Sequence, residues 1–189
     1  MQIAEHAPLL TVEDYLEGEQ YSEVRHEFIG GVVYAMAGGS GEHNAICLNL
    51  ATVLHPHLRA KACRLFMADV KVRLRIADDD LFYYPDLMIA CDPRDTDRYF
   101  KRFPRVLIEV LSETTERTDR REKFLSYTQI ETLEEYVLVA QDRMEVTLFR
   151  RVNQWHPQIL TKAELSLQLA SIDFAMPLVG IYEGVQFGR

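Results

Sequence analysis

Long hydrophobic runs are missing from this sequence. The longest apolar stretches, such as 106–111, are short and interrupted by charge, whereas a membrane-spanning helix needs about 20 apolar residues. The first ten residues also lack the basic leader and the apolar run of a secretion signal. We therefore expect a cytoplasmic protein with no membrane segment.

Cysteine is scarce as well. The three cysteines, Cys47, Cys63 and Cys91, are odd in number, widely separated and form no C-x-x-C pair. This spacing argues against both a disulfide framework and a thiolate zinc site. We expect three reduced, mostly buried thiols.

Basic residues are fewer than acidic residues. The 189 residues include 21 Lys and Arg against 29 Asp and Glu, a formal net charge of -8. Because cations supply most non-specific affinity for nucleic-acid phosphates, any DNA contact must be local. Basic residues do cluster in 59–75, 101–105 and 117–123. The rest of the composition is that of a globular protein, and the length suits one domain, 1–189.

Local patterns predict helices and strands in alternation. The adjacent glycines Gly30 and Gly31 permit a tight hairpin turn, and apolar residues recur at helical spacing after Glu42. The expected helices are 11–18, 42–61 and 116–129, and the expected strands are 25–29, 32–36, 66–76, 81–91, 106–111, 136–139, 146–149 and 155–160. Segment 92–104 is expected to be a loop, and 172–184 to pack on the core without a defined element. This order favours an α/β fold, that is, an α+β arrangement with a mixed sheet.

Two acidic residues stand inside apolar segments. Glu109 interrupts Val-Leu-Ile-Glu-Val-Leu, and Asp86 interrupts Tyr-Tyr-Pro-Asp-Leu-Met-Ile directly after Pro85. An unpaired buried charge is costly, so each carboxylate needs a partner. If the two strands are neighbours, both acids can project from one face of the sheet. Convergent carboxylates without soft ligands favour a hard cation such as Mg²⁺.

The same residues carry a resemblance to a known family. Pro85-Asp86, Ile108-Glu109-Val110 and Lys123 together resemble the PD-(D/E)XK phosphodiesterase superfamily. More narrowly, the sequence resembles the Uma family of restriction-endonuclease-like proteins, through 108–112, Thr114, 119–120, 122–123 and Tyr127. The hairpin 27–34 and His43-Asn44 are similar to the N-terminal half of that family, so the likeness covers nearly the whole chain.

One position departs from the superfamily pattern. In a plain D/E-x-K motif the lysine lies two residues after the acid, where this sequence has Leu111. Lys123, on the following predicted helix, would have to reach the same point in space. The narrower family shares this displaced lysine, so the resemblance implies that the lysine has moved from position 111 to position 123 and has not been lost.

The resemblance implies a fold and a metal-assisted reaction. The expected fold is a restriction-endonuclease-like core, with a central mixed β-sheet flanked by helices and an N-terminal hairpin. The expected reaction is the hydrolysis of DNA phosphodiester bonds with Mg²⁺, or Mn²⁺ as an alternative. Asp86, Glu109 and the Val110 carbonyl would hold the ion. Lys123 would orient the attacking water or stabilise the charge on phosphate.

Three further residues complete the expected catalytic group. Tyr127 and Asp119 lie about one helical turn from Lys123, so both can share its helix face and position its ammonium. Glu27, from the hairpin, would add a third acidic group for a second metal or for water activation. Because cutting both strands of a duplex takes two sites, we expect a homodimer.

Each of these residues also has a structural interpretation. Glu109 could form a buried ion pair with Arg105 or Arg120, and Asp86 could be an ordinary turn acid. Lys123 and Glu27 could be solvated, and Tyr127 could be a core residue with a satisfied hydroxyl. His43 suits a helix start and Asp69 an exposed strand position; neither receives a role.

The function therefore has alternatives. A catalytically inactive nuclease fold could serve as a DNA-binding or protein-interaction module, and the acidic charge favours that alternative. An RNA- or nucleotide-directed hydrolase could use the same site. The glycine-rich segment 38–41 lacks the lysine and Ser/Thr of a P-loop, which disfavours nucleotide hydrolysis of that class.

Overall fold

The computed structural model describes residues 9–112 and 116–187, so Thr114 of the family motif lies outside the described part. The helical elements are α1 (Val12–Glu19), α2 (Gly41–Leu58), α3 (Glu116–Thr118), the π-helical turn η1 (Asp119–Lys123), α4 (Phe124–Tyr127), the 3-10 turns η2 (Arg151–Asn153) and η3 (Ala170–Ile172), and α5 (Leu178–Ile181). The strands are β1 (His26–Ile29), β2 (Val32–Ala35), β3 (Arg64–Met67), β4 (Lys71–Ile76), β5 (Asp79–Tyr83), β6 (Leu87–Ala90), β7 (Phe100–Lys101), β8 (Pro104–Leu111), β9 (Glu135–Ala140), β10 (Val146–Arg150), β11 (Pro157–Leu160), β12 (Ser166–Leu169) and β13 (Phe174–Pro177).

The strands form two larger sheets and one separate pair. A six-stranded sheet has the order β11-β10-β9-β8-β6-β3, and a five-stranded sheet has the order β2-β1-β5-β4-β7. Strands β12 and β13 form an antiparallel pair. The pairs β8–β9 and β4–β7 are parallel and the other pairs are antiparallel. This mixed architecture confirms the expected fold class, with two large sheets where one was expected.

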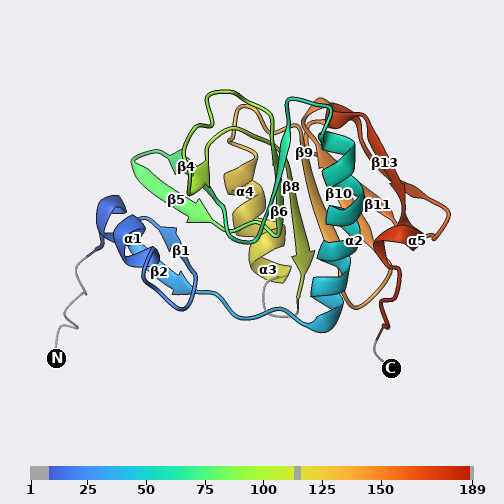
Figure 1. Ribbon diagram of the computed structural model, residues 1–189, viewed down its shortest axis with the longest axis horizontal. Helices are drawn as coiled ribbons and strands as arrows, with labels where there is room; N and C mark the ends of the chain where they lie inside the picture. Colours follow the sequence, from blue (N-terminus) through green and yellow to red (C-terminus); the bar gives the residue numbers. More distant parts are fainter. Residues whose placement is uncertain (1–8, 113–115, 188–189) are drawn as a thin grey trace.

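Helices cover both faces of the six-stranded sheet. Figure 1 shows α2 in front of this sheet, and α3 and α4 behind it. Strand β8 supplies apolar residues to both sides, since Ile108 and Val110 pack in the α2 cluster while Leu107 and Leu111 pack with Tyr127 of α4. A strand with two covered faces reads as a nearly continuous apolar run, which is the pattern of 106–111.

The N-terminal segment follows its local signals. Thr11 caps α1 through a reciprocal capping box with Asp14. Gly30 and Gly31 adopt φ values of 55° and 92° and close the β1–β2 hairpin. Both values lie in the left-handed region that glycine adopts without a steric penalty. The N-cap of α2 is Ser40, whose hydroxyl accepts from the His43 N–H.

Two expected strands are each divided in the structure. Segment 66–76 becomes β3 and β4, and segment 81–91 becomes β5 and β6. In both cases the chain leaves one sheet and enters the other. Ala68, with φ of 50°, breaks the first segment. Pro85 lies in the second break, where its missing N–H removes a potential sheet hydrogen bond. Asp86 therefore lies just before β6, not inside a strand.

Several shorter elements also differ from expectation. The predicted helix 116–129 is interrupted by the π-helical turn η1. The expected loop 92–104 contains the short strand β7, and the last segment contains β13 and α5. Strand β11 starts at Pro157 because Gln154 and Trp155 adopt left-handed φ values of 53° and 61°.

The expectation of three reduced thiols is wrong. Cys63 and Cys91 form a disulfide, and Cys47 is the free, buried cysteine. The pairing follows from the register of β3 and β6, in which Arg64 lies opposite Ala90. The residues that flank this pair are Cys63 and Cys91, so antiparallel pairing brings together two cysteines that are 28 residues apart in sequence. A separation of this kind cannot be recognised from spacing alone.

Residues 9–112 and 116–187 contain no helix with the length and apolar composition needed to cross a membrane.

Candidate active site

Glu109 projects from β8 into the interior. Side chains alternate along a strand, so Glu109 shares the α4 side of the sheet with Leu107 and Leu111. The residue is only 2% exposed. A carboxylate at this depth must be compensated by partners that arrive from other elements.

Asp86 reaches Glu109 from the position just before β6, the strand that pairs with β8. Leu87 of β6 lies opposite Ile108 of β8, which places Asp86 beside Glu109. The Asp86 N–H donates to Glu109 Oε2 at 3.3 Å, and the Val110 N–H donates to Asp86 Oδ2 at 2.7 Å. The expected adjacency of the two acids is therefore present, with two hydrogen bonds that cross between their residues.

Lys123 supplies the positive charge. Its Nζ lies 3.0 Å from Glu27 Oε1, 3.3 Å from Glu109 Oε1 and 3.2 Å from Asp119 Oδ1. Glu27 comes from β1 of the five-stranded sheet, Glu109 from β8 of the six-stranded sheet, and Asp119 from the same π-helical turn as Lys123. The lysine is 5% exposed, so the ammonium and the three carboxylates form one buried ion cluster.

Tyr127 orients the central carboxylate. Its hydroxyl donates to Glu109 Oε1 at 2.9 Å, and its ring is fully buried. Edge-to-face contacts with Tyr83 and Tyr136 hold the ring in place. The sequence predicts that Tyr127 positions the lysine ammonium, whereas the structure places its hydroxyl on Glu109.

The charges in this cluster shift the pKa values of its members. Burial raises the pKa of Glu109 well above its usual value; Lys123 opposes this effect, while Asp119, Asp86 and Glu27 add to it. Burial alone would lower the pKa of Lys123, but the negative charges of Glu109, Asp119 and Glu27 hold it well above its usual value. Carboxylates outnumber the ammonium, so the site carries an excess of negative charge.

His43 and Cys47 also reach this region, from α2. His43 Nε2 lies 3.0 Å from Asp86 Oδ1. The hydrogen bond to Asp86 raises the pKa of His43, although burial opposes the shift. The sequence gives neither residue a role. Their i, i+4 spacing on a predicted helix shows only that they share a face, not that this face meets Asp86.

The structural alternatives are resolved in part. Arg120 pairs with Glu116 and Glu145, not with Glu109. Asp69 is exposed and pairs with Arg25, outside the cluster. Glu27 is partly buried and contacts Lys123, so it is not an ordinary surface acid.

The structure thus brings together Asp86, Glu109, Lys123, Glu27 and Tyr127, with the Val110 backbone beside them. Their catalytic and metal-binding roles remain predictions.

The similarity of the chain to known proteins agrees with this arrangement of acidic and basic side chains. Residues 12–178 match the model of the Uma2 family, described as "Putative restriction endonuclease". The chain belongs to the Uma2 family. The match contains every element that contributes to the ion cluster, from β1 through α4.

Relatives of this Uma2 chain match it along nearly its whole length. One uncharacterized protein of Synechocystis sp. is 34% identical over 182 residues, covering 95% of each chain. A second from the same organism is 33% identical over 180 residues, covering 93% of this chain and 98% of the relative. A crystal structure of a "putative nuclease belonging to DUF820" from Anabaena variabilis has a TM-score of 0.76 at 16% identity, covering 94% of this chain and 99% of that chain. At that identity the likeness shows a shared fold.

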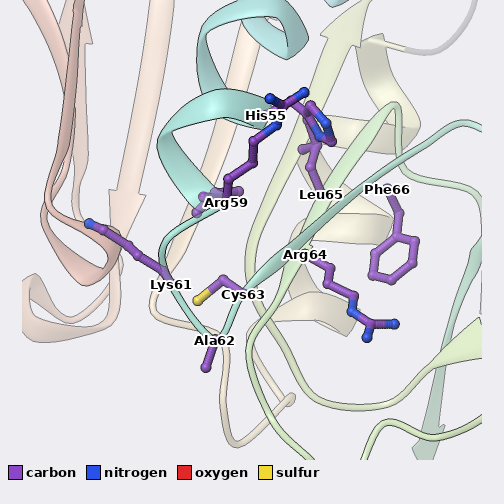
Figure 2. Close-up of a pocket in the computed structure, with 9 residues that line it drawn as sticks. His55, Arg59, Lys61, Ala62, Cys63, Arg64, Leu65 and Phe66 are labelled. Carbon is purple, nitrogen blue, oxygen red and sulfur yellow. The ribbon is translucent and has the colours of Figure 1, made fainter.

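The Uma2 chain also has an open pocket of about 530 Å³ at the opposite end of α2 from His43. Its lining includes His55, Arg59, Lys61 and Arg64. Figure 2 shows Lys61 and Arg64 pointing in opposite directions. The Lys61 ammonium donates to the Ile172 carbonyl. Lys61 and Arg64 therefore do not converge on one point, and the ion cluster is the stronger candidate for the active site.

Replacing Lys123 with methionine should lower the free energy of unfolding by about 3–5 kcal/mol, because the buried carboxylates lose their cation. The pKa of Glu109, already raised, should rise further. A carboxyl group whose pKa is raised by folding stabilises the protein fully below its unfolded pKa and loses that contribution as pH increases. The deficit should therefore be larger at neutral pH than at acid pH, as measured by urea denaturation.

The exposed Lys162 provides a matched control for this substitution. Lys162→Met should leave the unfolding free energy almost unchanged at both pH values. A Lys123→Met variant as stable as the wild type at neutral pH would contradict the view that the lysine holds the cluster together.

Proposed function

We propose that this Uma2 protein is a Mg²⁺-dependent endodeoxyribonuclease that hydrolyses DNA phosphodiester bonds. The observation that carries the proposal is the contact of Glu109 in β8 with both Asp86, which directly precedes β6, and Lys123 of the turn η1. The family description and the name of the Anabaena structure, which both refer to nucleases, support the same reaction class.

The donor set fits a hard divalent cation. Asp86 and Glu109 offer carboxylate oxygens, the ligands that Mg²⁺ prefers. Burial raises the pKa of Glu109, and the neighbouring carboxylates Asp119, Asp86 and Glu27 raise it further; a bound cation would relieve the repulsion among them. Asp86, Glu109 and the Val110 carbonyl would hold the ion. When bound, Mg²⁺ would neutralise charge on a phosphoryl oxygen and lower the pKa of a bound water.

The chain's own residues would then position the reacting groups. Lys123 would donate hydrogen bonds to the phosphate or to the attacking water, where negative charge develops. Tyr127 keeps Glu109 in one orientation through its hydroxyl. Glu27 would accept a proton or a hydrogen bond from water on the side of the five-stranded sheet. Positioning of this kind lowers the barrier by organising the reactants before the reaction.

A catalytically inactive module is the second candidate, and one observation favours it. Glu109 and Lys123 are 2% and 5% exposed, and Lys123 already contacts three carboxylates. Such a cluster could serve stability alone. The nuclease proposal requires a phosphate or a metal ion to enter from the Asp86 side, where the side chain is 18% exposed.

Asp86→Asn and Lys123→Met should each reduce Mg²⁺-dependent cleavage of duplex DNA by about 100-fold or more, because the first removes an anionic ligand of the ion and the second removes the charge that stabilises the reacting phosphate. A gel assay of a supercoiled plasmid, run below the melting temperature of each variant, measures the rates. Asp69→Asn is the matched control, since Asp69 is exposed and lies outside the cluster. Cleavage by Asp86→Asn at the wild-type rate would remove Asp86 from the mechanism.

Calorimetric titration should detect Mg²⁺ binding to the wild type at millimolar concentrations, and Glu109→Gln should weaken it strongly because one anionic ligand becomes neutral. This measurement needs no DNA and so tests the metal site by itself. A wild-type protein that takes up no Mg²⁺ in the millimolar range would favour the inactive module.

The proposal includes a two-fold dimer, because cutting both strands of a duplex takes two sites. Sedimentation velocity at the concentration of the cleavage assay should give a single species with twice the mass of the 21.9 kDa chain. If the active species sediments as a monomer, each molecule would cut one strand at a time.

A further inference from the structure

A second set of potential metal ligands lies on the α2 side of Asp86. His43 and Cys47 are one helical turn apart on α2, and Asp86 faces them from the junction of β5 and β6. The ligand atoms of the three side chains all lie within 4.8 Å of one another. Nitrogen, sulfur and oxygen donors thus converge at one place.

One of these side chains has a buried nitrogen without a partner in the described part of the chain, and another has a free thiol. His43 Nδ1 is buried and makes no hydrogen bond within the described residues. A buried polar atom without a partner usually costs about 1–3 kcal/mol. Cys47 is the free cysteine, because Cys63 and Cys91 are joined to each other. Its thiol is therefore available as a ligand without breaking another bond.

The donor set differs in kind from the carboxylates of the ion cluster. Mg²⁺ takes oxygen ligands, whereas zinc-class ions bind imidazole nitrogen and thiolate sulfur together with carboxylate oxygen. We propose that His43, Cys47 and Asp86 form a binding site for a zinc-class transition-metal ion. Binding through His43 Nε2 would displace its hydrogen bond to Asp86 and leave the proton of the neutral ring on Nδ1, which has no partner among the residues that the structure describes, while the thiol proton would be released to solvent. The fourth position of a tetrahedral ion would remain open to water.

The observed spacing suits such an ion after a small movement. Zinc bonds of about 2.0–2.3 Å in a tetrahedral arrangement place neighbouring ligand atoms roughly 3.5 Å apart. The three atoms lie within 4.8 Å, so closing the site takes a shift of roughly 1 Å, which side-chain rotation can supply. His43 Nε2 and Asp86 Oδ1 are already 3.0 Å apart.

The proposal does not depend on nuclease activity, although the site shares Asp86 with the proposed Mg²⁺ site. Its occupant is defined by ligand chemistry alone. The two proposals can therefore fail separately, provided that binding is measured without DNA.

Absorption spectroscopy with Co²⁺ tests the site in the full chain, because a thiolate bound to Co²⁺ gives a charge-transfer band in the near ultraviolet. One equivalent of Co²⁺ should produce this band in the wild type. Cys47→Ser should abolish the band, and His43→Ala should weaken Co²⁺ binding by more than about 10-fold, the loss that even an outer-shell partner causes. His55→Ala, an exposed histidine on the same helix, should keep the wild-type band.

The absence of the band in wild-type protein would overturn the proposal, whatever the variants do. A band that persists in Cys47→Ser would also overturn it, since the absorbing ligand would then be another group. A wild-type band in a protein that does not cleave DNA with Mg²⁺ would leave this site in place and remove the nuclease proposal. Mg²⁺-dependent cleavage without the band would do the reverse.

Discussion

The contact of one buried ammonium with three carboxylates is the constraint on which the rest of the structure depends. Lys123 meets Glu27, Glu109 and Asp119 at 3.0–3.3 Å. These groups come from the five-stranded sheet, the six-stranded sheet and the turn between α3 and α4, so the cluster joins three parts of the fold. Burial of ionised groups costs free energy, and this cost is offset only while all four side chains keep their contacts. The same residues therefore link the stability of the fold to the geometry of the candidate site.

Much of the fold can be predicted from local sequence signals, and the errors have one physical cause. The glycine pair, the helical spacing of apolar residues in α2 and the apolar run of β8 each predict their element because the signal acts within a few residues. The alternating charges of 66–76 and the apolar composition of 81–91 each predict one strand. A change of sheet at Ala68 or Pro85 is decided by tertiary packing, which a pattern of period two does not contain. The Cys63–Cys91 pairing was missed for the same reason.

The candidate site could be predicted less completely than the fold. A carboxylate inside an apolar strand identifies Glu109 without any relative, since burial demands a partner. Asp86 and Glu109 can be connected from the residues on the condition that their strands are neighbours, but the resemblance to a family is needed to add Lys123, because nothing in its spacing shows that it meets them. His43 and Cys47 were not recognised as part of the region. Their helical spacing is that of any buried face, and only the structure shows that this face reaches Asp86.

The side chains of the site differ in their exposed fractions, and this difference limits the direction from which a substrate could enter. Glu109 and Lys123 are almost completely buried, while the side chains of Asp86 and His43 are 18% and 20% exposed. Under the proposed function, a phosphate or metal ion would therefore meet Asp86 first, at the edge where α2 begins. The N-terminal end of a helix carries partial positive charge, which offsets part of the repulsion between an acidic protein and a phosphate. The carboxylates of the ion cluster act in the opposite direction, so under the proposed function a phosphate would need the bound cation to approach Glu109.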